Sequence, residues 1–436
     1  MVKIIHLADT HLGYRARKGT INQWAVKNYS KPYEQEIYDI FLKVMNNISK
    51  MGNVDFVVHC GDMFHMPSKY SSYPPQEPAR RVLKEGLDLF FKNTGNKVPL
   101  IYIEGNHGVY RGYEYTPFES IINNDNYSNL FYYKERDLLE AIKNNHPLTL
   151  EFKEKKTRFF LFPYFEFKSF EVYKNAYNNW ISVQKPDEND NYINIAVAHG
   201  SEADDTLHKK IKFDDYEYDY LALGHEHGLI EKSKNRFYAG SLLPMNFKES
   251  LEQQGYLIID IDDEKHDLKI KKILSNQLIT RPFEIIPVDI SPQETSEELR
   301  NKIKLILDNY IDSDGFNPKT SARLKLNFFG EMTFEKVWLI NDLMIKFRRE
   351  CFSEIDKYNI LQLIWKTTDM SERFENDTSP GIIEDFILEN PEEEFKDFVK
   401  EKLSDDSSQF NVDKLTEFGM EALKNALKIM DREEEV

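Results

Sequence analysis

Short apolar runs that end in polar residues recur along the chain. Runs of this kind, bounded by glycine and polar residues, predict buried strands. Five of them end in residues that can bind a metal, and their sequences are VKIIHLAD, VDFVVHCGD, VPLIYIEGNH, INIAVAHG and YLALGHEH. In layered α/β proteins the ligand site lies at the carboxyl ends of such strands, so the pattern predicts a metal site there.

The side chains at or just after these strand ends include two carboxylates, one amide and four imidazoles. They are Asp9, His11, Asp62, Asn106, His199, His225 and His227. The set exceeds what one tetrahedral ion uses and contains no thiolate, so it favours two ions such as manganese, iron or zinc. Two such ions, roughly 3.5–4 Å apart, clamp a phosphoryl oxygen and activate a water molecule. We therefore expect hydrolysis of a phosphoester.

Each motif alone has a plainer interpretation. Gly-Asp and Gly-Asn often mark turns, and a single histidine is usually structural. Five strand ends with ligand residues in one chain make the metal site the stronger interpretation. For His6 and His59 the plainer interpretation holds, because both lie inside apolar runs. We expect these two in the core and outside the site.

The hydrophobic pattern also predicts the other elements. Helices are expected at Glu34–Met51 and Pro78–Asn93, and strands near Arg158–Phe162, Ile193–His199, Tyr220–Gly224, Arg236–Ala239 and Tyr256–Asp260. Beyond about Gln277, a strand at 279–290, a helix at Ser296–Tyr310, a strand at Ser321–Phe329 and a helix at Thr333–Glu350 predict a small α+β domain. After a linker, apolar stripes at 382–403 and 415–430 predict two amphipathic helices with acidic opposite faces.

Composition sets further bounds. The 436 residues can bury a sizeable core and predict two domains with an appendage. Cys60 and Cys351 give no disulfide framework. No apolar stretch approaches the roughly 18 residues of a membrane span, and the N-terminus enters a strand directly, so we expect neither a span nor a signal peptide. A reducing, cytoplasmic compartment, or the nucleus in a eukaryote, is the simplest expectation.

The charge distribution bears on nucleic-acid binding. The net charge of −17 is unusual for a protein that holds DNA, because phosphate contacts need Lys and Arg. However, residues 372–435 contain 20 acidic and 8 basic side chains, a net charge of −12, which leaves −5 for the rest. The segment 15–33 is basic and has no acids, with Arg15, Arg17 and Lys18 directly after the first metal motif. It is either an ordinary solvated loop or a contact with the DNA backbone.

Together these motifs resemble a known family. The signatures are Asp9-x-His11, Gly61-Asp62, Gly105-Asn106-His107, His199-Gly200 and Gly224-His225-x-His227, and they resemble the five motifs of the calcineurin-like metallophosphoesterases. Within that family, HLADTHLGYR and GDMFH resemble the Mre-eleven and SbcD double-strand-break repair nucleases. The histidine at position 65 resembles the pattern of the archaeal and eukaryotic branch, because the SbcD pattern has aspartate at this position. The resemblance with specific motifs covers about residues 1–260.

The resemblance implies a fold and a domain organisation. It implies a nuclease domain at residues 1–275 with an α/β fold, in which helices flank two central β-sheets. A small α+β capping domain would follow at 276–370. The acidic linker and amphipathic helices at 371–436 would bind the coiled coil of an ABC-type ATPase, called Rad-fifty or SbcC. The alternative is that these helices pack on their own protein.

The resemblance also implies roles for the site residues. One ion would be held by Asp9, His11, Asp62 and His227, and the other by Asp62, Asn106, His199 and His225. His107 would stabilise the transition state or protonate the leaving oxygen, and His65 would face the DNA and help place the scissile phosphate, chiefly in exonuclease cleavage. The family's usual Gly-Asn-His-Asp is Gly-Asn-His-Gly here, with Gly108 in the last position. An acidic neighbour of His107 is therefore missing.

The function implied is a manganese-dependent DNA nuclease in a double-strand-break repair complex. It would use two manganese ions and act as a three-prime to five-prime exonuclease and a single-strand endonuclease. Helices at Ala79–Asn93 and Thr116–Asn123 would pair with their copies in a homodimer. Two alternatives are a phosphoesterase for small phosphodiesters or phosphoproteins, and a non-catalytic scaffold. All seven ligand positions are filled, which makes the scaffold the weakest of the three.

Overall fold

The structure, a computed structural model, describes most of the chain before residue 370. The described residues are 1–14, 21, 32–65, 77–108, 116, 118–122, 127–165, 175–177, 179–187, 191–200, 217–278, 281–317, 319–354 and 357–369. The basic side chains Arg15, Arg17 and Lys18 lie outside these ranges, and so does the predicted tail at 371–436.

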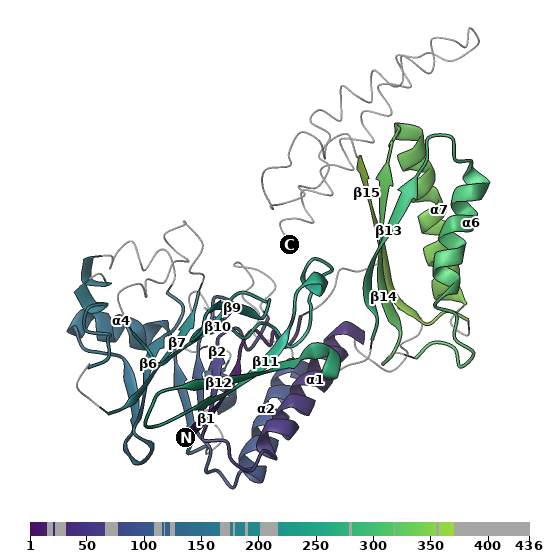
Figure 1. The fold of residues 1–436 in the computed structure, drawn as a ribbon. Coiled ribbons are helices and arrows are strands. Elements are labelled where there is room, and N and C mark those ends of the chain that lie inside the picture. The colour runs from purple at the N-terminus through teal and green to yellow at the C-terminus, as the bar shows by residue number, and fades with distance from the viewer. Residues whose placement is uncertain are drawn as a thin grey trace. The chain divides into compact units, whose positions relative to one another are not determined.

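The first of two large sheets contains the three N-terminal motif strands. Its strands are β1 (Val2–Leu7), β2 (Phe56–Cys60), β3 (Leu100–Ile103), β4 (Leu130–Tyr133), β11 (Gly255–Ile261) and β12 (Leu268–Leu274). The order is β12-β11-β1-β2-β3-β4, and Figure 1 labels β1, β2, β11 and β12 of this sheet. The strands β1 to β4 run parallel, whereas β11 pairs antiparallel with both β1 and β12. The carboxyl ends of β1, β2 and β3 therefore meet at one edge.

The second large sheet contains the two later motif strands. Its strands are β5 (Thr149–Phe152), β6 (Thr157–Phe162), β7 (Ile193–His199), β8 (Tyr220–Gly224), β9 (Ile230–Ser233) and β10 (Arg236–Tyr238). The order is β5-β6-β7-β8-β10-β9, with β6, β7, β8 and β10 parallel and the two edge strands antiparallel. The two sheets, flanked by helices, confirm the predicted fold class.

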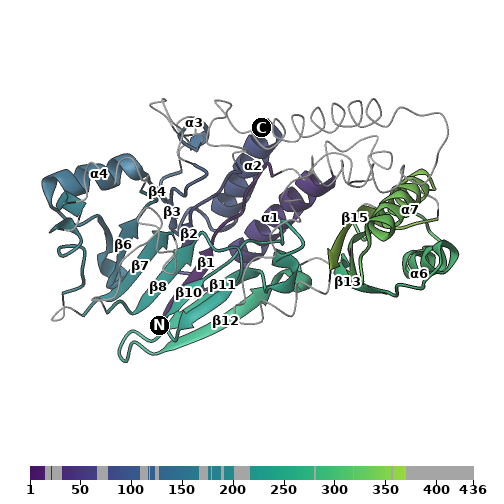
Figure 2. The ribbon, with the colours of Figure 1, turned by 90° about the horizontal axis from the view of Figure 1, so that it is seen from above.

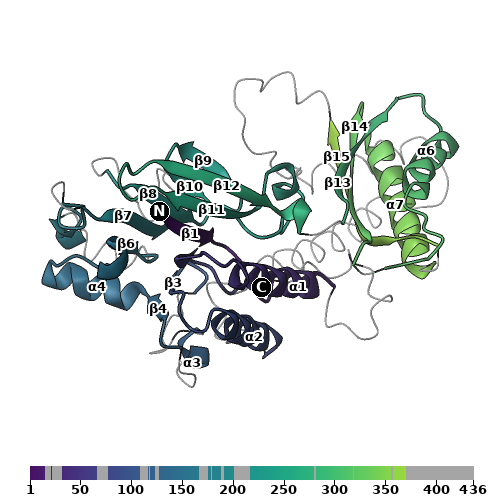
Figure 3. The ribbon, with the colours of Figure 1, turned by 60° about the horizontal axis from the view of Figure 1, so that its bottom comes forward.

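Alternation of side chains along the strands of the first sheet builds two cores. Ile4 and Val58 point to one face, where they pack in a core shared with the second sheet. Their neighbours Ile5 and Val57 point to the other face and pack with helices α1 (Pro32–Ser49) and α2 (Glu77–Asn93). These two helices lie side by side (Figure 2, Figure 3). A strand buried on both faces reads as a continuous apolar run, which is the pattern seen in the sequence.

Shorter helices complete this part of the chain. They are α3 (Glu119–Ile122), α4 (Glu135–Asn144) and the 3-10 turns Lys153–Lys155, Glu249–Leu251 and Ser275–Gln277. Leu138, Ala141 and Ile142 of α4 pack in the core between the sheets. Among the described residues no helix is long and apolar enough to cross a membrane.

A separate three-stranded sheet follows. It contains β13 (Phe283–Ile290), β14 (Ala322–Gly330) and β15 (Ile360–Asp369) in the order β13-β14-β15, with helices α6 (Ser296–Asp308) and α7 (Phe334–Ser353) on one side (Figure 1). The Thr295 side chain accepts a hydrogen bond from the Glu298 N–H and Glu298 reaches back, a capping box that begins α6 where the sequence predicts it.

The elements predicted within the described residues are present, with ends shifted by a few residues, whereas the two helices predicted in the tail lie outside those residues. The sequence pattern missed helix α4 and the strands β4, β5, β9, β12 and β15. Strand β12, LKIKKIL, is largely exposed and carries three lysines, so it lacks the apolar run of a buried strand.

Five of the six apolar side chains that suggested a homodimer are buried within the single chain, and the sixth, Ile122, is partly buried. Leu83, Leu87 and Phe90 of α2 are fully buried, and Phe118 and Ile121 are at most 6% exposed. All five belong to the core formed with α1 and the first sheet. They therefore offer no exposed surface to a second copy.

His6 links the two sheets. Its Nε2 donates a hydrogen bond to the Leu223 carbonyl on β8 at 3.1 Å, and its Nδ1 lies 2.8 Å from the Tyr220 hydroxyl on the same strand. Burial lowers the pKa of His6 to about 3, although the bond to Leu223 raises it. His59 is also buried, with Nε2 3.2 Å from the Thr10 hydroxyl. Both histidines are core residues, as their positions in apolar runs predict.

Acidification should destabilise the protein through His6. Below its ordinary pKa of 6.5 the unfolded chain binds a proton that the folded chain binds only near pH 3, so unfolding becomes easier as pH falls. The contribution is about 1.4 kcal/mol per pH unit for this group. We expect His6→Gln to lower stability at neutral pH and to flatten the pH dependence of urea unfolding below about pH 6. His146→Gln, at an exposed histidine, is the control. Equal slopes for wild type and His6→Gln would contradict the assignment.

Candidate metal centre

The predicted ligands come together where the strands of both large sheets end. Asp9 and His11 follow β1, and Asp62 follows β2. Backbone hydrogen bonds join these two loops, from the Asp9 N–H to the Gly61 carbonyl at 3.1 Å and from the His11 N–H to the Asp62 carbonyl at 3.0 Å. The second sheet is tied to the first because the His225 N–H donates to both Asp9 carboxylate oxygens, at 3.1 and 2.9 Å.

One group of side chains surrounds His11. Its Nε2 lies 3.0 Å from Nε2 of His227 and 3.7 Å from Oδ2 of Asp62. Ligand atoms of Asp9, His11 and His227 all lie within 4.8 Å of one another. The four side chains Asp9, His11, Asp62 and His227 thus form the first predicted group.

A second group surrounds the Asn106 side chain. Its Oδ1 lies 2.8 Å from Nε2 of His199 and 3.0 Å from Nδ1 of His225. Nε2 of His199 is also 3.6 Å from Oδ2 of Asp62. The same carboxylate oxygen therefore lies between the two groups, close to an imidazole nitrogen of each.

The proton positions in these groups favour cations. Nδ1 of His199 donates to the Cys60 carbonyl at 2.7 Å, so the neutral ring turns the lone pair of Nε2 toward Oδ1 of Asn106. In this orientation the two lone pairs face each other at 2.8 Å, and a cation between them would be bound by both. Burial lowers the pKa of His199, which disfavours a proton there. The donor set fits a metal ion.

Glu249 is a functional candidate that the sequence pattern did not reveal. Its Oε1 accepts a hydrogen bond from Nδ1 of His227 at 3.0 Å, and its Oε2 accepts from the Met245 N–H at 2.7 Å. Because Nδ1 carries the proton, Nε2 of His227 is left for a metal, the arrangement typical of metal-binding histidines. Glu249 lies in a 3-10 turn that does not directly follow a strand, so no strand-end signal marks it.

Electrostatics in the site follow from burial and close charges. Burial raises the pKa of Asp9 well above its ordinary value, and the Asp62 carboxylate adds to the rise. Burial alone would raise the pKa of Asp62, but His199, His107 and the His107 N–H lower it overall. Burial lowers the pKa of His227, yet the Glu249 hydrogen bond and Asp9 raise it to about 9. A divalent cation would replace the proton on His227 and neutralise both carboxylates.

Backbone conformation at the site is strained. The φ angles of Asp9, His11, Asp62 and His225 are 49°, 44°, 55° and 103°. Residues with side chains rarely adopt positive φ, and each such residue costs about 1–3 kcal/mol unless its surroundings hold it there. Four of the seven predicted ligands share this property, which indicates that the fold holds their side chains in place at a cost.

The motif glycines make room for ligand side chains. A Cβ at Gly61 would lie 2.1 Å from Nδ1 of His199, and one at Gly105 would lie 2.1 Å from Oδ1 of Asp62. A Cβ at Gly224 would lie 1.9 Å from the Cys60 carbonyl oxygen, the acceptor that orients His199. These glycines are therefore required by close packing around the site, in addition to any part they play in turns.

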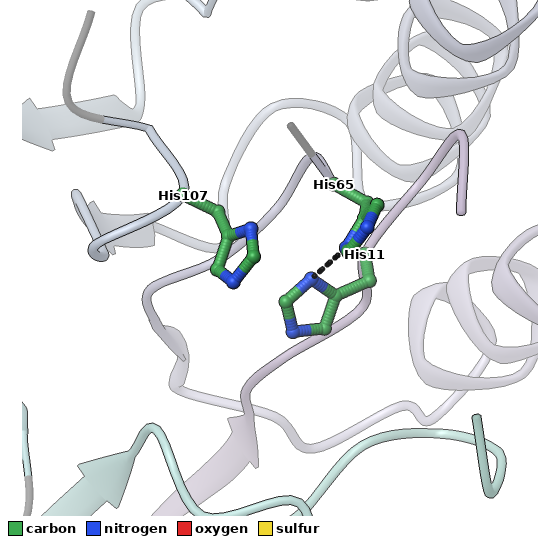
Figure 4. Close-up of side chains that lie close together, drawn as sticks. All are labelled: His11, His65 and His107. Atoms are coloured by element: carbon green, nitrogen blue, oxygen red, sulfur yellow. Dashed lines mark hydrogen bonds between the residues drawn. The ribbon is translucent and has the colours of Figure 1, made fainter. Parts of the chain in front are cut away.

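His107 and His65 form a cluster with His11. Nδ1 of His65 lies 3.3 Å from Nδ1 of His11, and the rings of His65 and His107 stack with centroids 4.9 Å apart (Figure 4). The rings of Tyr14 and His65 pack edge to face, with their centroids 4.8 Å apart. The backbone N–H of His107 donates to Oδ1 of Asp62 at 2.8 Å. His107 is thus tied to the central carboxylate through its backbone while its ring joins the histidine cluster.

Comparisons with known proteins identify the family. Residues 2–229, more than half of the chain, match the family described as calcineurin-like phosphoesterase. The SbcD subunit of the nuclease SbcCD from Staphylococcus epidermidis is 26% identical over 438 residues, which cover 95% of this chain and 97% of that protein. The DNA double-strand break repair protein Mre11 of Methanococcus maripaludis is 32% identical over 108 residues, 25% of this chain and 23% of that protein.

A second SbcD subunit of a nuclease SbcCD, from Staphylococcus saprophyticus, is 26% identical over 290 residues, which cover 61% of this chain and 67% of that protein. The chain is thus similar both to SbcD subunits and to an Mre11 protein. Because the family match covers more than half of the chain, including all seven predicted ligands and the strands that precede them, the chain belongs to the calcineurin-like phosphoesterases, enzymes that hydrolyse phosphate esters.

Proposed function

We propose that this protein is a manganese-dependent DNA nuclease that acts with two metal ions in the repair of double-strand breaks. The observation that carries the proposal is the position of Asp62, whose Oδ2 lies 3.7 Å from Nε2 of His11 and 3.6 Å from Nε2 of His199. One carboxylate oxygen between two groups of nitrogen and oxygen donors is what a bridging ligand requires.

Asp9, His11, Asp62 and His227 would hold one ion, and Asp62, Asn106, His199 and His225 the other. Ligand atoms about 2.1 Å from an ion, at angles near 90–110°, lie about 3.0–3.4 Å apart. The contacts of 2.8 to 3.7 Å within the two groups support this assignment. When bound, such a pair of ions supplies Lewis-acid activation of the phosphoryl group and of the attacking water.

The chain's own residues would orient the reactants. The N–H of His107 fixes Oδ1 of Asp62, which leaves Oδ2 for the metals. Glu249 and the Cys60 carbonyl set the tautomers of His227 and His199. The imidazole of His107 is not assigned as a ligand of either ion and would hold a proton for the leaving oxygen.

The choice of DNA as substrate rests on the relatives and on His65. Relatives that cover most of this chain carry the name nuclease. His65 stacks on His107 beside the ligands, which suits a role in placing the scissile phosphate. The basic side chains Arg15, Arg17 and Lys18 would contact the DNA backbone, and three-prime to five-prime exonuclease and single-strand endonuclease activities are part of the proposal.

The partner is proposed to be an SbcC-type or Rad-fifty-type ABC ATPase, bound by the two tail helices within 371–436. The relatives are named as one subunit of SbcCD, which supports a partner. A cytoplasmic or nuclear location would follow from that role. A homodimer, tested by light scattering at tens of micromolar, would need an interface other than the buried side chains Leu83, Leu87 and Phe90.

The test of the function is degradation of end-labelled DNA by the purified chain. We expect activity with manganese, loss of activity with a chelator and recovery on adding manganese back. Bis-phenyl phosphodiester serves as a competing small substrate. Hydrolysis of this ester without any cleavage of DNA would overturn the nuclease assignment in favour of a small-phosphodiester enzyme.

Replacing Asp62 and His107 should have different effects on metal content. Asp62→Ala removes the carboxylate between both groups, so both ions and activity should be lost. His107→Ala should reduce kcat by at least about 100-fold while two ions stay bound, because His107 is assigned to the transition state and not to the metals. Metal content by mass spectrometry and single-turnover cleavage provide the readouts. Two bound ions in Asp62→Ala would refute the bridging role.

Replacing His65 should separate the two nuclease activities. We expect His65→Ala to reduce exonuclease activity far more than endonuclease activity on single strands, because placement of the duplex end is lost while the metals are kept. Metal content should stay unchanged. If both activities fall by the same factor, His65 supports His11 through their Nδ1 contact and does not place DNA.

Truncation after Pro380 tests the tail. All seven predicted ligands precede residue 228, so manganese-dependent cleavage should remain nearly intact while ATPase binding fails. In the full chain, Leu423→Asp should weaken binding far more than Glu433→Gln, because apolar burial contributes about 25 cal/mol per Å². Loss of bound metal in the truncated chain would show that the tail belongs to the catalytic part.

A further inference from the structure

The turn that carries Asn106 and His107 has an unusual support. The turn is closed by a hydrogen bond from the Gly108 N–H to the Gly105 carbonyl at 3.2 Å. A Cβ at position 108 would lie 1.4 Å from Oε1 of Glu104. The Glu104 carboxyl group therefore fills the space in which a side chain of residue 108 would begin.

Glu104 is fixed at both ends. Its side chain accepts hydrogen bonds from the hydroxyls of Tyr102, at 2.9 Å, and Tyr132. Its backbone N–H donates to the Tyr133 carbonyl at 2.8 Å, and its carbonyl accepts from the Tyr164 N–H at 2.9 Å. The residue is only 3% exposed. The carboxyl group thus has little freedom to move away from position 108.

The Glu104 carboxyl is a costly choice for a purely structural position. Burying a carboxyl group costs several kcal/mol unless its partners compensate, and an apolar residue would fill the same space more cheaply. The hydrogen bonds that its side chain accepts from Tyr102 and Tyr132 come from neutral hydroxyls. A role beyond packing is therefore indicated.

We propose that Glu104 is a positioning residue for the hydrolytic reaction: its carboxyl group supports the 105–108 turn from the inside and replaces an acidic side chain at position 108. The turn places Oδ1 of Asn106 2.8 Å from Nε2 of His199 and the His107 N–H 2.8 Å from Oδ1 of Asp62. Glycine at 108 and glutamate at 104 then depend on each other, because a side chain at 108 would occupy the space of the Glu104 carboxyl group. The inference rests on the proposed function for its kinetic readout.

The proposal is tested by moving the carboxyl group from position 104 to position 108. We expect Glu104→Ala to reduce kcat about 10- to 100-fold with little change in KM for DNA, because a small displacement of catalytic groups has effects of this size. Gly108→Asp alone should be at least as impaired, because two carboxyl groups compete for one space. The double variant Glu104→Ala/Gly108→Asp should recover to within about threefold of wild type. A purely structural role would lower the thermal midpoint of Glu104→Ala without the selective loss of kcat.

Gly108→Ala provides a test that leaves Glu104 in place, should the Glu104 variants fail to fold. The added methyl group should displace the carboxyl and reduce kcat about tenfold or more. Gly52→Ala is the matched control, because a Cβ there meets nothing within 4 Å. Manganese affinity by calorimetry and the thermal midpoint are measured for every variant. We expect every variant to bind two ions. Only in Gly108→Ala should binding of the metal by Asn106 be weakened.

The outcomes separate the inference from the function. Wild-type activity in Gly108→Ala, or a double variant no better than the worse single variant, overturns the role of Glu104 while the nuclease assignment stands. Absence of manganese-dependent cleavage by the wild-type chain overturns the proposed function itself.

Discussion

Buried charge and facing lone pairs at the metal centre must be compensated. Asp62 is 2% exposed and lies between two sets of imidazole and amide groups. A buried carboxylate without compensation costs far more than one hydrogen bond returns. The lone pairs of His199 and Asn106 face each other at 2.8 Å. Divalent cations resolve both problems at once, so metal binding and the stability of this site are coupled.

The two-sheet architecture makes such a site possible. Parallel strands bring Asp9, Asp62 and Asn106 to one edge of the first sheet, and the shared core holds β7 and β8 beside them. Positive φ angles at the ligands and close contacts at Gly61 and Gly105 are tolerated because the strands on either side are buried and rigid. Strain in the loops is thus offset by packing in the sheets.

Side chains outside the motifs complete the centre. Glu249 orients His227 from the 3-10 turn that precedes β11, and Glu104 fills the space behind Gly108. Neither Glu249 nor Glu104 was marked as a ligand by its spacing in the sequence. Partners of this kind are selected by shape and hydrogen-bond geometry, so they can be recognised only when the distances are known.

Local sequence was enough to predict the motif strands, the seven candidate ligands and the core placement of His6 and His59, because apolar runs and the residue types at their ends are local properties. Other features depended on tertiary packing. Packing placed one oxygen of Asp62 between the two groups and paired His227 with Glu249. It also buried Leu83, Leu87 and Phe90 inside the chain, where the sequence pattern allowed either a core or an interface. These are contacts between residues far apart in the chain, and their geometry depends on how the sheets and helices pack.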